Sequence, residues 1–187
     1  ITKNQVSLPL YVNSVKESTG RKISLKYKPL ASFKQDEEKN NSFVPIPIIV
    51  PDEMTIENTL RPDHKVNYSY HGGFYDPHRR HFMGFSIVEK NGQTTHEKNN
   101  YYNGTFANAV PQKSYPYVYE GLLYRSEIWA EIRADIGDEK NNLLVTKQYK
   151  HSIKVVGKKV FVHPTQAKEL FYYDNKSSES VITEYVY

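Results

Sequence analysis

The side chains best suited to metal or acid–base chemistry gather in one short stretch of the chain. They are His71, Asp76, His78 and His81. Imidazole and carboxylate groups are common ligands of zinc and related metals. The spacing of these residues matches no established metal motif, and the guanidinium groups of Arg79 and Arg80 would repel a bound cation. We therefore expect a solvated loop here, with no metal and no cofactor.

The same stretch holds the densest group of basic side chains, and tyrosines precede it in the sequence. Guanidinium groups bind phosphate, sulfate or carboxylate through paired hydrogen bonds, and aromatic rings stack on bases or sugars. One interpretation is a binding patch for a glycan or polyanion, made of Tyr68, Tyr70, His78, Arg79, Arg80 and His81. The other interpretation is a basic loop tip beside aromatic residues of the core.

Charged residues alternate with apolar ones between residues 125 and 135. If this segment is a strand, one face carries Arg125, Glu127, Trp129, Glu131, Arg133 and Asp135. Carboxylates beside an aromatic ring are typical of a carbohydrate-binding or polysaccharide-cleaving groove, so Trp129 joins the candidate ligand-binding residues. The alternative is that these charges pair across neighbouring strands and that Trp129 covers the rim of their face.

The sequence lacks the motifs of the common enzyme classes. It has no G-x-S-x-G elbow for a serine nucleophile and no G-x-x-x-x-G-K-[ST] or G-x-G-x-x-G loop for phosphates. Because it has no cysteine, it also lacks a thiol nucleophile and a disulfide framework. We therefore predict a protein that is not an enzyme and has no catalytic residues.

The size and composition of the chain fit one folded domain over residues 1–187. Aromatic residues make up 13% of the sequence, and each one that is buried removes roughly 150–250 Å² from water. The formal net charge of +4 comes from 25 basic and 21 acidic residues spread along the chain, so nucleic acid is only a minor alternative as a partner. The longest apolar stretch, residues 43–50, is too short to cross a membrane, so we expect no transmembrane segment.

The N-terminal residues alternate as in a strand with one apolar face. Over residues 5–12 that face would carry Val6, Leu8, Leu10 and Val12. Pro9 has no N–H to donate, so this strand should lie at the edge of a sheet. A turn over residues 17–21 and a second strand over 22–28 should follow. We expect residues 1–13 to be an edge strand that can be exchanged between copies.

Turn residues separate further strands in the middle of the chain. Strands are expected over residues 66–70 and 82–89, with turns at Gly72–Gly73 and Asp76–Pro77 between them. A hairpin should close at Asn91–Gly92, because both residues tolerate the positive φ of a two-residue turn. The three prolines of residues 43–51 favour an extended or edge segment that pairs poorly.

The C-terminal third is less regular. Residues 126–136 fit both the strand period and the helix period, and we favour a strand because the flanking segments are β-like. Two strands are expected over residues 143–150 and 152–162, the second with a bulge at Gly157. The remaining expected elements are a short helix from Pro164 to about Leu170 and a last strand over residues 180–187.

These eight to ten short strands predict a mainly β fold, an antiparallel sandwich or jelly roll with one or two short helices. An apolar edge strand and a tyrosine-rich surface favour a protein that assembles. We predict a structural subunit of a coat, fibre or appendage, forming homo-oligomers at the extracellular surface or in a virion through the four apolar anchors of residues 5–12. A carbohydrate- or polyanion-binding module is the alternative, and a polysaccharide-active enzyme is a third hypothesis.

Overall fold

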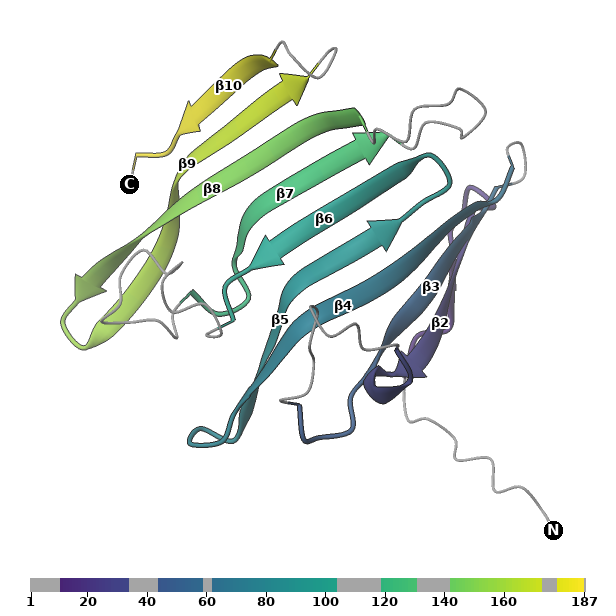
Figure 1. The fold of residues 1–187 in the computed structure, drawn as a ribbon, viewed down its shortest axis with the longest axis horizontal. Coiled ribbons are helices and arrows are strands. Elements are labelled where there is room, and N and C mark those ends of the chain that lie inside the picture. The colour runs from purple at the N-terminus through teal and green to yellow at the C-terminus, as the bar shows by residue number, and fades with distance from the viewer. Residues whose placement is uncertain are drawn as a thin grey trace.

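Ten strands form one antiparallel sheet in the computed structural model (Figure 1). The structure describes residues 11–33, 44–58, 62–103, 119–130, 142–172 and 178–186. The strands are β1 (Ser14–Lys16), β2 (Lys22–Pro29), β3 (Ile49–Glu57), β4 (His64–Asp76), β5 (His81–Asn91), β6 (Thr95–Tyr101), β7 (Leu123–Ala130), β8 (Asn142–Val156), β9 (Lys159–Tyr172) and β10 (Ser178–Glu184). Each strand pairs with the next one in the sequence, so the sheet is a simple meander.

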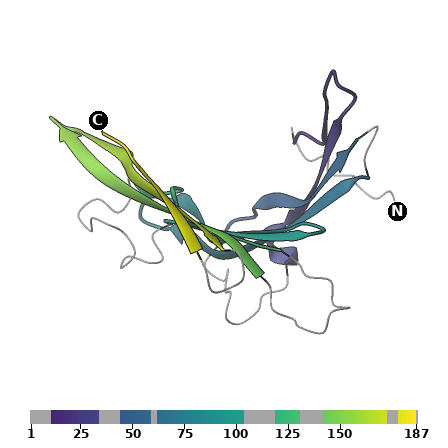
Figure 2. The same cartoon turned by 90° about the horizontal axis from the view of Figure 1, so that it is seen from above.

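The expected mainly β, antiparallel class is confirmed, but the sandwich or jelly roll is not. The described strands belong to one curved layer, whose two ends bend toward the same side in Figure 2. A sandwich needs two sheets that bury a common face between them. Here consecutive strands continue the same sheet, so the described residues form no second layer.

The predicted short helix after Pro164 is wrong, because these residues belong to β9. The helix-forming residues of this segment pair with β8 on one side and β10 on the other. Pro164 fits because the register between β8 and β9 shifts beside it, at Lys150–His151, where a missing N–H costs little. The described residues include one 3-10 turn with defined bounds, η1 (Leu30–Ser32), and Tyr119 also has 3-10 conformation.

Gly157 forms a hairpin turn and not the bulge that we expected. Val156 pairs with Lys159, so Gly157 and Lys158 alone connect β8 to β9. The φ of Gly157 is +61°, which suits the first central position of a type II′ turn. The predicted hairpin at Asn91–Gly92 is confirmed, since β5 ends at Asn91 and pairs with β6.

The other strand predictions hold to different extents. The turn over residues 17–21 and the strand over 22–28 are confirmed as the β1–β2 hairpin, and residues 126–130 lie in β7. Of the segment 43–51, residues 49–51 enter β3 and pair with β2, which the prolines did not suggest. The predicted turn at Gly72–Gly73 is wrong, because β4 continues through it to Asp76.

Two small apolar clusters on the sheet replace a single central core in the described residues. In the first, Leu30, Val50 and Tyr70 are buried together with aromatic and aliphatic neighbours. In the second, Tyr102 and Tyr119 pack with side chains from β7, β8 and β9. Each cluster lies where a segment beside the strands covers the sheet: η1 and residues 44–48 for the first, and residues 119–122 for the second.

A glycine in β4 allows a close crossing between strands, and a first prediction follows from it. A Cβ added at Gly72 would lie 2.0 Å from Ser86 Oγ, and the φ of Gly72 is +60°. We expect Gly72→Ala to lower the free energy of unfolding by about 2–4 kcal/mol, from backbone strain plus the clash. Gly84→Ala is the matched control, because Gly84 also has a positive φ but its added Cβ meets nothing within 4 Å.

Chemical denaturation of both variants checks this prediction. Gly84→Ala should lower the free energy of unfolding by only about 1 kcal/mol, from backbone strain alone. The excess cost of Gly72→Ala should fall when Ser86 is also replaced by glycine. Equal costs for the two single variants would contradict the steric explanation.

Candidate assembly edges

The two outermost strands, β1 and β10, leave one side of their backbones without a partner in the described part of the chain. Val15 in β1 is 50% exposed, and Val181 and Ile182 in β10 are 55% and 52% exposed. An open edge with exposed apolar side chains is a template for another strand. Both edges can therefore join this sheet to a further strand through backbone hydrogen bonds.

The hydrogen bonds of β10 identify which of its residues face the open side. Tyr185 N donates to Thr165 O over 3.0 Å, in continuation of the regular pairing between β9 and β10. Backbone groups of successive residues in an antiparallel strand point to alternate sides. Val181 and Thr183 therefore bond to β9, whereas the N–H groups of Ser180 and Ile182 point outward. The open edge of β10 thus offers regularly spaced donors and acceptors.

Of the four predicted N-terminal apolar anchors, the structure describes only Val12. Val6, Leu8 and Leu10 lie outside the described residues. Val12 is 55% exposed, and its carbonyl accepts a hydrogen bond of 3.0 Å from Tyr27 Oη. Tyr11 and Val12, the last two residues of the strand predicted over residues 5–12, lie outside the strands of the structure, and β1 begins at Ser14. The role of Val6, Leu8 and Leu10 as apolar anchors stays a prediction.

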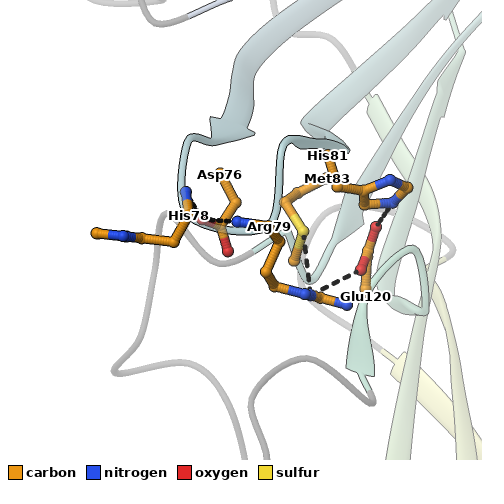
Figure 3. Close-up of polar contacts among 6 residues, drawn as sticks. All are labelled: Asp76, His78, Arg79, His81, Met83 and Glu120. Atoms are coloured by element: carbon orange, nitrogen blue, oxygen red, sulfur yellow. Dashed lines mark hydrogen bonds and ion pairs between the residues drawn. The ribbon is translucent and has the colours of Figure 1, made fainter.

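The basic loop tip is a turn held to a distant carboxylate (Figure 3). Asp76 Oδ1 accepts hydrogen bonds from the backbone N–H groups of His78 and Arg79, at 2.9 and 3.2 Å. Glu120 lies within 2.7 Å of His81 Nε2 and 3.6 Å of Arg79 Nη1. Arg79 and His81, two of the predicted ligand-binding residues, therefore already have a partner within this chain, Glu120. No sequence pattern points to this partner, because Glu120 is 39 positions from His81 along the chain.

The structure brings the predicted ligand-binding residues together only in part: Tyr68 and Tyr70 stack with ring centroids 6.4 Å apart, and Trp129 lies elsewhere. Tyr70 is buried and donates to Pro51 O over 2.8 Å, and burial raises its pKa well above the usual value. Tyr68 contacts Met54 through its hydroxyl. Trp129 packs on His96, at the opposite end of the sheet from the turn that contains Arg80. These side chains belong to packing contacts in different places, so they do not form one patch.

The charges of β7 pair along their own strand. Arg125 Nη2 forms an ion pair with Glu127, two residues further on. The expected pairing across strands is therefore not seen for this pair, and the later residues of the charged face, Glu131, Arg133 and Asp135, lie outside the described part. No group of three metal-ligating side chains occurs among the described residues. No helix in that part is long and apolar enough to span a membrane.

His151 gives the protein a pH-dependent contribution to stability. Its Nδ1 atom is buried without a hydrogen-bond partner among the described residues, and its ring lies 6.4 Å from that of Tyr102. Burial lowers the pKa of His151 below its ordinary value of 6.5. The unfolded chain therefore takes up a proton at a higher pH than the folded chain does, and stability is lost as pH falls from 6.5 toward the folded pKa.

Replacing His151 with phenylalanine tests this contribution. The natural chain should lose stability relative to His151→Phe as the pH falls from neutral to about 5, because only the natural chain carries this histidine. Urea denaturation at a series of pH values measures the difference. A difference that does not change with pH would refute the assignment.

The N-terminal part of the chain matches a known protein family. Its description is "Insecticide toxin TcdB middle/N-terminal region", and the match covers residues 2–113, more than half of the chain. The chain belongs to this family. The description names a region of a toxin and no enzymatic activity. No curated protein matches the chain in sequence.

Solved structures of toxin complexes share the fold. The crystal structure of TcdB2-TccC3 without the hypervariable C-terminal region has a TM-score of 0.66 and 14% identity over 91% of this chain. The Photorhabdus luminescens Tc holotoxin pore has a TM-score of 0.73 and 15% identity over 91%. TcdB2-TccC3-Cdc42 has a TM-score of 0.60 and 14% identity over 82%. The chain spans only 11%, 11% and 10% of those chains.

These comparisons support the broad expectation about function but not its finer parts. The family and the similar structures give no support to a coat, fibre or appendage role, to a virion, or to the binding of a glycan or polyanion. The family description names a toxin, and the similar structures are toxin complexes, which agrees with the broader expectation of a protein that assembles.

Proposed function

We propose that the chain is a structural panel of a TcdB-type toxin component. In this role it is a curved segment of sheet that further strands extend at both edges. The observation that carries the proposal is the open meander itself, with β1 and β10 unpaired on their outer sides in the described residues. A sheet that buries little apolar surface of its own gains stability from neighbours, as repeat proteins do.

The similar structures support a panel within a larger body. They are a complex of TcdB2 with TccC3 and a Tc holotoxin pore, and the chain spans 11% of the similar chain in each. By analogy, the panel would contribute to an assembly that contains a TccC-type partner and acts outside the cell that makes it. The joining strands would then come from the same component or from its partner, in addition to copies of this chain.

The N-terminal segment is the proposed means of extension at the β1 edge. Val6, Leu8, Leu10 and Val12 would anchor an added strand by their apolar face. Replacing Leu8 and Leu10 with serine would remove two of these anchors and weaken joining at that edge.

The solution mass of the chain tests the proposal. Light scattering over a concentration series should show association of the intact chain, because both edges are open. Removal of residues 1–13 should reduce that association without unfolding the domain, which circular dichroism can check. A strict monomer at every concentration, in both forms, would refute joining through the edges.

A further inference from the structure

The β8–β9 hairpin carries a concentration of positive charge that the described residues leave largely uncompensated. Between residues 143 and 168 the sequence has no aspartate or glutamate. The lysines of this stretch are Lys147, Lys150, Lys154, Lys158, Lys159 and Lys168. Among them, Lys147 alone forms an ion pair within the described part of the chain, with Glu169 at 3.1 Å. The other five can meet a negatively charged partner.

A hollow of about 590 Å³ lies at the middle of this hairpin and is lined by residues of β7 to β10 and by Tyr102. Its lining consists of polar and apolar side chains: Tyr102, Tyr124, Arg125, Gln148, Tyr149, Lys150, Gln166, Lys168 and Ile182. No carboxylate is among the lining residues. The hollow therefore combines positive charge, amide groups and aromatic surface in one place.

The strand register puts the two lysines of the hollow on one face. Gln148 pairs with Lys168, and Lys150 pairs with Gln166, so all four side chains share a face of the sheet. Lys150 and Lys168 are diagonal neighbours across β8 and β9. Such neighbours lie about 7–8 Å apart in a regular sheet.

The other charged groups around the hollow are already engaged. Arg125 is ion-paired with Glu127. Glu184, in β10, accepts a hydrogen bond of 3.4 Å from Gln166 Nε2. Lys150 and Lys168 form no ion pair with a described residue, so they are the groups with charge to offer a ligand.

We propose that this hollow binds an acidic polypeptide segment in extended conformation, with carboxylates at alternate positions that contact Lys150 and Lys168. In an extended chain, alternate side chains point the same way and are spaced by about 6.6–6.8 Å, close to the diagonal spacing of the lysines. About four or five such residues span β7 to β10, because neighbouring strands are about 4.8 Å apart. The amide of Gln148 can pair with a peptide group, which has both a donor and an acceptor.

The site is distinct from the sheet edges of the proposed function. The ligand would lie across the face of β7 to β10, where side chains recognise it, whereas edge joining uses the outward backbone groups of β10. Binding of a peptide and association of the chain are therefore separate measurements.

A fluorescent peptide of alternating glutamate and alanine is the probe. Its binding to the full chain is measured by fluorescence anisotropy at low ionic strength. The double variant Lys150→Gln, Lys168→Gln should bind about tenfold more weakly, since it loses two exposed charge contacts. Lys158→Gln with Lys159→Gln is the matched control, because it removes the same charge at the hairpin tip, and it should change the affinity by no more than about twofold.

Three outcomes would overturn the proposal. Equal losses in the two double variants would mean general attraction to a basic hairpin and no site. Competition by inorganic phosphate as strong as by unlabelled peptide would mean a site for free anions. Failure of the peptide to bind, with capture of anionic lipid vesicles that depends on the same lysines, would mean a lipid surface. A variant blocked at the β10 edge should still bind the peptide, so failure of one proposal is distinguishable from failure of the other.

Discussion

Replacing Ser180 with proline should abolish association through the β10 edge while leaving the sheet folded. The N–H of Ser180 points away from β9, so proline removes a donor from the open side and none from the ladder with β9. The proline ring also blocks the close approach of an incoming strand. We expect the mass of the chain that lacks residues 1–13 to fall to that of a monomer when this substitution is added.

Two control variants separate edge blocking from damage to the fold. Ser180→Thr keeps the N–H and should associate as the natural chain does. Val181→Pro removes a donor that points toward β9, so it should lower stability by about 1–3 kcal/mol. Association that persists in Ser180→Pro, with the fold intact, would show that the β10 edge is not a joining surface.

Replacing Tyr119 with alanine should have the largest effect on stability. Tyr119 is 1% exposed and packs against Tyr102, with ring centroids 5.6 Å apart in an edge arrangement. The same cluster includes Ile153 and Val162 of the β8–β9 hairpin. We expect a loss of about 3–5 kcal/mol in the free energy of unfolding, as is usual for a large aromatic side chain removed from a packed site. Chemical denaturation measures it.

A conservative variant and a surface variant complete this test. Tyr119→Phe keeps the ring and should cost less than about 1.5 kcal/mol, the contribution of a typical hydrogen bond. Phe161→Ala lies on the same hairpin but is 52% exposed, so its effect should stay near 0.5 kcal/mol. A cost for Tyr119→Ala no larger than that for Phe161→Ala would contradict the assignment of the second cluster as a packed core.

The strands were more predictable from the sequence than their arrangement. Alternation of apolar and polar residues located most of the strands, and Asn91–Gly92 located one hairpin turn. Alternation reports that one face of a strand is apolar, but it does not report whether a second sheet covers that face. The sandwich was therefore a natural expectation, and the single meander could be found only from the pairing of consecutive strands.

Local helix and turn propensity predicted the wrong structure where the pairing between strands decides it. Residues 164–170 have helix-forming character, yet residues 166–170 pair with β8 on one side and with β10 on the other. The sequence predicts a bulge at Gly157 because the residues on its two sides have the pattern of one strand. Its positive φ instead serves a turn between two strands of 15 and 14 residues.

The candidate sites depended on contacts between distant residues, which the sequence pattern does not contain. Arg79 and His81 looked available for a ligand, but Glu120 contacts both. Tyr70 looked like a stacking surface, but it is buried in the first cluster. The basic β8–β9 hairpin, in contrast, has a signal that a charge count finds, because residues 143–168 contain no acidic residue.

The most direct measurement of the central claim is amide hydrogen exchange at β10, in the chain alone and in the complete toxin component. If the panel is extended at this edge, the outward amides of Ser180 and Ile182 exchange quickly in the isolated chain and become protected in the assembly. The amides of Val181 and Thr183, which bond to β9, are protected in both. Fast exchange at Ser180 and Ile182 in the complete component would contradict the proposal that another strand joins the sheet there.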